Sequence, residues 1–260
     1  MSPFTYCEIS EMIDHALLHP TLSEEGLVEG CALADLYSTA TVCVKPCDVK
    51  KANTILSESP TEVCTVIGFP HGANTTEIKI KETEIACKDG AKEVDLVINL
   101  GRAKSWDWPY IEGEITAVQK TAYLYGAKLK VIFENDYWQD GTLGPQSDQF
   151  KEKLCQICVY AGADWVKTST GFGYVPQPDG SLKTEGATEH DINLMVRACS
   201  EKAEVKAAGG VKDFSTLLKM RSLGATRIGT SSTQKILDEC RKYLDLPSLS
   251  SVEISSSTGY

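Results

Sequence analysis

The sequence predicts an α/β protein built as a single (β/α)8 TIM barrel, and three observations support this prediction. Short apolar runs alternate with longer amphipathic segments, which is typical of parallel strands joined by helices. The chain contains eight such apolar runs. Its 260 residues are close to the ~250 that one barrel of this kind takes. A doubly wound open sheet is the alternative, but the GxGxxG motif that would favour it is absent after the first run.

The eight apolar runs are the predicted strands, and they begin near Ile13, Thr41, Val63, Val94, Leu129, Trp165, Val205 and Arg227. Predicted helices lie between them, for example over Ser23–Asp35, Thr76–Asp89, Ile111–Gly126, Gln149–Ala161, Glu189–Ser200 and Ser215–Gly224. Gly126, Gly162 and Gly224 close three of these segments, as glycine commonly does at the end of a helix. We expect one barrel domain over residues 1–246 with a short N-terminal helix, followed by a flexible Ser-rich tail over residues 247–260.

Charge and composition exclude several classes of function. The net charge of −10 argues against a nucleic-acid partner. No apolar run approaches the ~18 residues of a membrane span, and the first twelve residues lack the features of a signal peptide. The ten cysteines lie mostly within apolar runs, so we interpret them as reduced thiols of a cytoplasmic protein. Neither the single CxxC, Cys155 to Cys158, nor the four histidines have the spacing of a metal site, so we expect no metal.

Alternation along the predicted strands separates an apolar face from a charged one, since side chains two residues apart share a face. In residues 93–98, Val94, Leu96 and Ile98 share one face, and Asp95 lies on the other. The apolar faces should pack on the ring of helices, so the mixed faces should point to the barrel axis. This places one set of charged side chains inside the barrel: Asp14, Asp95, Lys130, Glu134, Lys167 and Lys206.

Such a cluster has two interpretations. It could be an ion-pair network that only holds the barrel together, and alternation alone slightly favours that. It could also be catalytic, because a lysine beside a second lysine in a buried site is easier to deprotonate. A neutral lysine amine attacks carbonyl groups and forms Schiff bases, with a nearby aspartate moving protons.

Glycines and hydroxyl residues after the last strands favour the catalytic interpretation. Gly209 and Gly210 follow the seventh predicted strand, and residues 229–232, Gly-Thr-Ser-Ser, follow the eighth. In barrels of this type the loops after strands seven and eight commonly bind a phosphate on backbone N–H groups. Together with Lys167 on the sixth strand, they indicate a phosphorylated carbonyl substrate.

At this point the sequence resembles a known family, the deoxyribose-phosphate aldolases, which are class I aldolases on a (β/α)8 barrel. The resemblance runs from about Ile13 to Ser232. It rests on seven collinear stretches: residues 13–20, 41–46, 65–74, 93–99, 167–172, 206–211 and 227–232. It implies a cytoplasmic lyase of deoxyribonucleotide catabolism, without cofactor or metal. The implied reaction is reversible cleavage of 2-deoxy-D-ribose 5-phosphate to D-glyceraldehyde 3-phosphate and acetaldehyde.

The resemblance also implies a role for individual residues. Lys167 matches the Schiff-base lysine, Lys206 the second lysine that keeps it neutral, and Asp95 the aspartate that acts as acid and base. Asp14 matches an aspartate that holds the polar network. Five further positions match the phosphate-binding loops: Gly171, Gly209, Gly210, Ser231 and Ser232. Some members end in a tyrosine that assists proton transfer, and Tyr260 is the last residue here. Members are often dimers, so a homodimer is an expectation.

Three departures from the family pattern stand out. Ala16 replaces a usual threonine, and Lys212 replaces a common arginine and loses its bidentate fork. The stretch from Gly173 to Gly186 is longer than usual. Its Pro and Gly residues predict an ordered turn at the barrel mouth, either a lid, a subunit contact or a solvated insertion without a role.

Two other functions remain open from the sequence. One is another Schiff-base lyase acting on a sugar phosphate or a keto acid. The other is a barrel that binds a sugar phosphate without catalysis.

Overall fold

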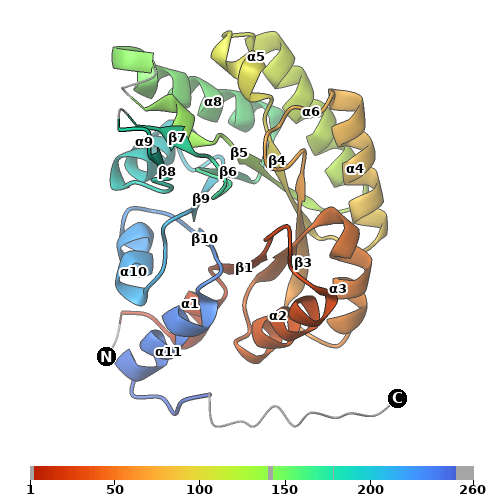
Figure 1. Cartoon of the computed structure of the whole chain (residues 1–260), viewed down its shortest axis with the longest axis vertical. Helices are drawn as coiled ribbons and strands as arrows, with labels where there is room; N and C mark the ends of the chain where they lie inside the picture. Colours follow the sequence, from red (N-terminus) through yellow and green to blue (C-terminus); the bar gives the residue numbers. More distant parts are fainter. Residues whose placement is uncertain (1–2, 140–142, 178, 250–260) are drawn as a thin grey trace.

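The computed structural model describes residues 3–139, 143–177 and 179–249. Within them, eight parallel strands close into a barrel in the order β1-β10-β9-β6-β5-β4-β3-β2, with helices around it (Figure 1). This confirms the predicted (β/α)8 barrel. The strands are β1 (Ile13–Leu17), β2 (Thr41–Val44), β3 (Glu62–Ile67), β4 (Glu93–Val97), β5 (Lys128–Ile132), β6 (Trp165–Lys167), β9 (Glu204–Ala208) and β10 (Arg227–Thr230).

The helices confirm the six predicted segments, with ends shifted by up to three residues. Gly162 caps α8 in the left-handed region at φ 79°, as glycine does after a final helical turn. The helices are α1 (Tyr6–Ser10), α2 (Glu24–Leu36), α3 (Val49–Ile55), α4 (Thr76–Lys88), α5 (Leu100–Lys104), α6 (Trp108–Leu124), α8 (Ser147–Ala161), α9 (Glu189–Cys199), α10 (Phe214–Ser222) and α11 (Thr233–Tyr243). The predicted short N-terminal helix is α1, which begins at a capping box formed by Thr5 and Glu8 and packs on α11.

The two faces of the strands pack in two different environments. The face with Val94, Leu96 and Ile98 joins the main hydrophobic core between strands and helices. Inside the barrel a second, small apolar cluster contains Cys43, Cys64 and Val66 on β2 and β3. The other inward positions carry most of the buried charges, so the barrel interior divides into an apolar wall and an ionic wall.

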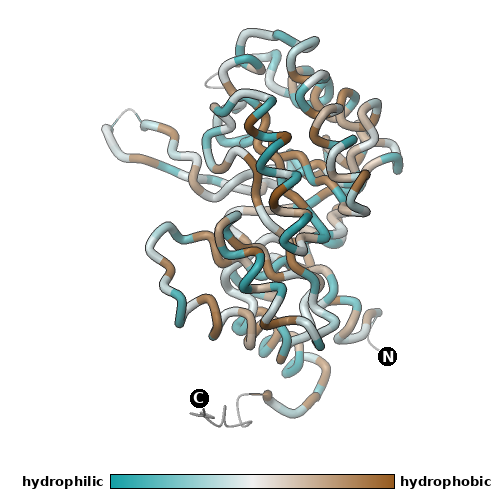
Figure 2. Tube along the Cα trace, turned by 90° about the vertical axis from the view of Figure 1, so that its right-hand side faces the viewer, coloured by the Kyte–Doolittle hydropathy of each residue, from teal (hydrophilic) through white to brown (hydrophobic). Residues whose placement is uncertain are grey.

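The segment after β6 leaves the barrel as a small antiparallel hairpin. Its strands β7 (Val175–Pro176) and β8 (Leu182–Lys183) pair with each other and not with the barrel. At the level where Figure 1 labels them, Figure 2 shows an arm that projects from the barrel. The expected ordered turn is therefore a hairpin, and its ends lie beside Phe172 and Gly209 at the barrel mouth.

The helices themselves are amphipathic, as Figure 2 shows by the alternation of hydrophilic and hydrophobic positions along the outer coils. In the part of the chain that the structure describes, no helix combines the length and apolar character that crossing a membrane requires.

Candidate active site

One carboxylate at the centre of the barrel joins three lysines. Asp95 Oδ2 accepts hydrogen bonds from Lys167 Nζ and from Lys206 Nζ, each at 2.7 Å. Asp95 Oδ1 accepts from Lys130 Nζ at 2.9 Å. Because Lys167 and Lys206 bind the same oxygen, their two nitrogens lie within twice that 2.7 Å of each other.

The strand register explains why these residues meet. Asp95 on β4 is paired with Lys130 on β5, and Lys167 on β6 is paired with Lys206 on β9. Paired residues of neighbouring parallel strands point to the same face, so all four side chains enter the barrel at adjacent levels. The four side chains are buried, and Lys167 is the most exposed of them at 4%.

Asp14 is the second carboxylate of this cluster. It accepts from Lys206 Nζ, from Arg227 Nη1 at 2.6 Å and from Thr41 Oγ1 at 2.8 Å. Lys206 is thus held between two carboxylates, Asp14 and Asp95. Five of the six side chains predicted to converge lie together here, and the sixth, Glu134, follows the end of β5 and binds Thr170 instead.

Two further members of the cluster, Glu93 and Arg227, were not among the side chains predicted to converge. Arg227 forms a bidentate pair with Glu93 through Nη1 and Nη2 at 3.0 and 3.1 Å, and Lys130 also pairs with Glu93. Alternation contained the signal, since Glu93 lies two residues before Asp95 and therefore shares its face. Both residues lie at strand starts, where a charge is usually solvated, and here they close the lower end of the barrel.

The charges shift one another's proton affinities. Burial alone would raise the pKa of the Asp95 carboxyl, but the three surrounding ammonium groups hold it well below its usual range. Burial alone would lower the pKa of Lys206, but the carboxylates of Asp14 and Asp95 raise it above its usual range. Lys206 therefore stays charged at neutral pH, and its charge lies next to the Lys167 amine.

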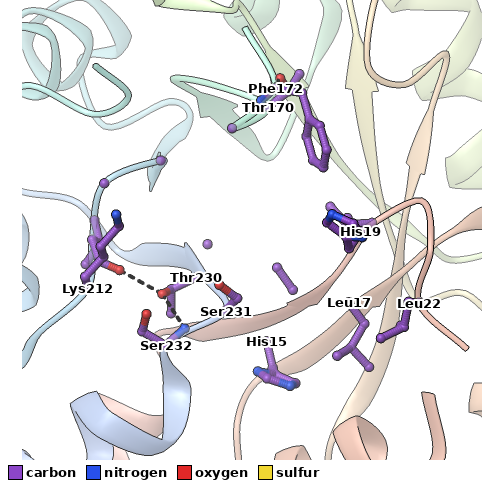
Figure 3. A pocket seen from close by; sticks show the side chains of 17 residues that line it. His15, Leu17, His19, Leu22, Thr170, Phe172, Lys212, Thr230, Ser231 and Ser232 are labelled. Atoms are coloured by element: carbon purple, nitrogen blue, oxygen red, sulfur yellow. Dashed lines mark hydrogen bonds between the residues drawn. The ribbon is translucent and has the colours of Figure 1, made fainter. Parts of the chain in front are cut away.

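A cavity of about 470 Å³ opens above this cluster, at the carboxyl ends of the strands. All five residues predicted for phosphate binding line it: Gly171, Gly209, Gly210, Ser231 and Ser232. Figure 3 shows Phe172, Lys212, Ser232 and His19 around this cavity, contributed by four separate loops. Gly229 lies in its floor, where an added Cβ would come within 3.1 Å of Lys206 Cε. Gly229 therefore separates the cavity from the ionic cluster, none of whose charged side chains lines the cavity.

The loop before α11 is fixed by its own threonine. Thr230 Oγ1 donates to Val211 O at 2.7 Å and accepts from Ser232 N at 2.9 Å, as the dashed lines in Figure 3 mark. Ser232 is also the N-cap residue of α11. The free N–H groups and the dipole at a helix N-terminus favour an anion there.

A second, mainly apolar cavity of about 320 Å³ adjoins the first. Leu18 and Phe172 line both cavities, and the ring of Phe172 packs edge-on against Phe69 at 5.4 Å. The site thus offers a polar cavity with glycine and serine loops next to a small apolar one.

A metal ion would fit this site poorly, although two groups of buried side chains have ligand spacing. Asp95 with Cys43 and Cys64 forms one group, and Asp14 with Cys64 and Glu93 the other. Both aspartates already bind two or more cationic side chains. An ion would have to displace a buried ammonium group from a cluster that is already rich in positive charge.

Glu134 lies above the cluster and fixes the loop that follows Lys167. Its carboxylate accepts from Thr170 N at 3.1 Å and from the Thr170 hydroxyl. Burial raises the pKa of the Glu134 carboxyl to about 7, although these two hydrogen bonds act in the opposite direction.

The departures from the resemblance also fall at the cavity. Ala16 and Lys212 both line it, so the missing hydroxyl and the changed cation lie where a substrate would contact them. Tyr260, the proposed proton-transfer residue, lies outside the described residues.

The comparisons with known proteins agree on one family. A model described as DeoC/LacD family aldolase matches residues 12–239. A deoxyribose-phosphate aldolase from Rhodopirellula baltica is 43% identical over 260 residues, which is all of both chains. An enzyme of the same name from Thermococcus kodakarensis is 41% identical over 233 residues, 89% of this chain and 96% of its own.

Solved structures give the same picture. An aldolase designated QR15 superposes with a TM-score of 0.80 at 35% identity, covering 92% of this chain and 99% of its own. A deoxyribose phosphate aldolase from Aeropyrum pernix, described as tetrameric, has a TM-score of 0.78 at 28% identity. That match covers 92% of this chain and 93% of the other.

The raised pKa of Glu134 predicts a pH-dependent cost in stability. The folded chain retains a proton on Glu134 over a range where the unfolded chain has released it, so this stabilisation is lost as pH rises through about 7. Between about pH 5.5 and pH 8, wild type should lose about 2 kcal/mol of unfolding free energy relative to Glu134→Gln. Urea unfolding of both proteins at the two pH values measures this difference.

Glu62→Gln is the matched control for this experiment, because Glu62 is an exposed carboxylate at the start of β3. Its profile should run parallel to that of wild type. If Glu134→Gln also runs parallel to wild type, the burial of Glu134 does not raise its pKa and the prediction is wrong.

Proposed function

Because the chain belongs to the DeoC/LacD family of aldolases, we infer that it cleaves 2-deoxy-D-ribose 5-phosphate reversibly to D-glyceraldehyde 3-phosphate and acetaldehyde. The protein is therefore an aldehyde-lyase. The observation that carries the mechanism is the single Asp95 oxygen that Lys167 and Lys206 share. The proposed roles of the individual residues follow from the charges around it.

We propose Lys167 as the Schiff-base nucleophile. In the described residues, direct ion pairs join three carboxylates, Asp14, Glu93 and Asp95, to four cationic side chains. The cluster therefore carries one positive charge in excess. Lys130, Lys206 and Arg227 each contact at least two of these carboxylates, and Lys167 contacts only one. Loss of a proton from Lys167 balances the cluster, so it is the amine that can attack the carbonyl carbon.

Lys206 and Asp95 serve this nucleophile in two ways. The charge of Lys206, fixed by Asp14 and Asp95, favours the neutral form of Lys167. Asp95 lies within hydrogen-bonding distance of both amines, so it can pass protons between Lys167 and the reacting carbon as the imine forms and breaks. Asp14 contacts Lys206 and Arg227 and so acts as a positioning residue.

The substrate phosphate is assigned to the large cavity. Three loops bring backbone N–H groups and serine hydroxyls to it, at Gly171, Gly209–Gly210 and Ser231–Ser232.

Assembly, location and the terminal residue are separate proposals. We propose a homodimer, for which light scattering in solution would give the mass. A cytoplasmic location is supported by the cysteines, all of which are free thiols, and cell fractionation would test it. Tyr260 is proposed to assist proton transfer, and its deletion should slow exchange of the acetaldehyde methyl protons with solvent.

Trapping with borohydride tests the nucleophile. Acetaldehyde with NaBH4 should leave an ethyl group on Lys167, detected by peptide mass spectrometry. Lys206→Leu removes the excess charge, so Lys167 keeps its proton; trapping should fall by about tenfold or more at neutral pH and recover at high pH. Lys128→Leu, at the exposed start of β5, is the control and should trap normally. Unchanged trapping in Lys206→Leu would refute the role given to Lys206.

A substrate comparison separates this function from the alternatives. The other Schiff-base lyases would share Lys167 but would prefer a different sugar phosphate or a keto acid, and a binding protein would cleave none. We expect kcat/KM for 2-deoxyribose 5-phosphate to exceed that for ribose 5-phosphate and for 2-keto acid aldols by about a hundredfold or more. Higher turnover of any of those compounds would replace the proposed substrate.

A further inference from the structure

Besides Glu134, the turn after β5 carries a second buried carboxylate that the proposed reaction does not use. Asp136 is 1% exposed, and its Oδ1 accepts hydrogen bonds from Glu185 N at 2.6 Å and from Gly186 N at 3.0 Å. Both donors belong to the returning end of the β7–β8 hairpin. Asp136 therefore attaches the base of that hairpin to the barrel.

The residues that Asp136 holds pack directly against a proposed phosphate loop. Ala187 N donates to Gly209 O at 3.1 Å. A Cβ added to Gly186 would lie 2.5 Å from the carbonyl carbon of Gly209, so the two backbones are in close contact. A Cβ added to Gly210 would lie 3.3 Å from Glu185 O. The hairpin base thus supports both glycines of that loop.

The same turn also holds the first phosphate loop. Glu134, two residues before Asp136, accepts from the backbone N–H and the hydroxyl of Thr170. Thr170 Oγ1 in turn accepts from Phe172 N at 2.9 Å. Gly171 therefore lies between Thr170, which binds Glu134 directly, and Phe172, which donates to Thr170.

These glycine loops need such support. Gly209 and Gly210 have φ values of 83° and 80°, which glycine adopts readily, but glycine also loses the most conformational freedom on ordering. A phosphate bound by backbone N–H groups requires those groups to be fixed in direction before it arrives.

We propose that the turn at residues 134–136 is the anchor of the substrate phosphate site, with Asp136 and Glu134 as positioning residues for the loops at 209–210 and 170–172. Asp136 acts through Gly186, and the hairpin base is part of the phosphate site. This inference rests on the proposed function, which assigns the phosphate to these loops.

The burial of Asp136 is consistent with this role. Its Oδ2 is buried and has no hydrogen-bond partner among the described residues. An unpartnered buried oxygen costs stability, so packing alone does not explain an aspartate here. The two hydrogen bonds made by Oδ1 fix the direction of the 185–186 peptide groups, which an apolar side chain could not do.

Two glycines of the hairpin provide a matched test. Gly186 and Gly180 both have left-handed backbone, at φ 74° and 81°, so alanine brings similar strain to each. Only at Gly186 would the new Cβ meet the Gly209 backbone, because nothing lies within 4 Å of a Cβ on Gly180. Titration calorimetry with inorganic phosphate should show a Kd about tenfold higher in Gly186→Ala and unchanged in Gly180→Ala.

A second test separates the hydrogen bonds of Asp136 from its charge. Asp136→Asn keeps an acceptor for the two N–H groups and should bind phosphate nearly as wild type. Asp136→Ala should raise KM for 2-deoxyribose 5-phosphate by about tenfold, with kcat/KM for unphosphorylated 2-deoxyribose unchanged. If Asp136 had only a structural role, Asp136→Ala would lower kcat/KM for both sugars by the same factor.

The outcomes distinguish this inference from the proposed function. Equal phosphate affinity in Gly186→Ala and Gly180→Ala would overturn the inference, as would an equal loss on both sugars in Asp136→Ala. Neither result would affect trapping of acetaldehyde on Lys167. Conversely, phosphate binding could depend on Gly186 as expected while the wild-type protein cleaves no 2-deoxyribose 5-phosphate. That result would support the anchor and refute the proposed function.

Discussion

The structure depends on one shared oxygen atom, Asp95 Oδ2, which accepts hydrogen bonds from two lysines on different strands. Only a closed barrel brings β4, β6 and β9 around a single point, because in an open sheet the outer strands would lie too far apart. Closure also brings in the other carboxylates, and Asp14 and Glu93 neutralise Lys206, Lys130 and Arg227. The ion pairs and the barrel therefore support one another.

Burying these charges costs free energy, and the way they are paired indicates a role beyond stability. A buried ion pair often adds little stability compared with well-packed apolar residues, while removal of one partner is strongly unfavourable. A network designed only for stability would match its charges completely. Here Lys167 is the least satisfied of the four cations, because it contacts one carboxylate and the others contact at least two. A reactive amine is expected to be paired incompletely, as Lys167 is. Within the same cluster, Lys167 therefore has the nucleophilic role that we propose, and the more fully paired cations have a supporting one.

Alternation along the strands predicted the fold and the main ionic cluster, because strand period and burial are local properties of the sequence. Asp95, Lys167 and Lys206 could be placed on one axis from spacing alone, and their mutual distance follows from the register. Glu93 and Arg227 were left out of the predicted cluster because charges at strand starts are usually solvated. Asp136 and Gly186 could not be found in this way, since their contact joins segments fifty residues apart through backbone groups that carry no sequence signal.

The two halves of the site pose opposite physical problems. The ionic cluster is rigid because its strands fix it, and its members need long side chains to reach the axis. The phosphate cavity is bounded by glycines, which allow close backbone approach but supply no rigidity of their own. Rigidity must then come from neighbouring residues, and the turn after β5, the strand next to β6, supplies part of it. This turn directs Glu134 to the loop after β6, and Asp136 to the hairpin base that packs on the loop after β9. On this view the long hairpin is not an addition to a complete site, because its base takes the place of contacts that the glycine loop cannot make for itself.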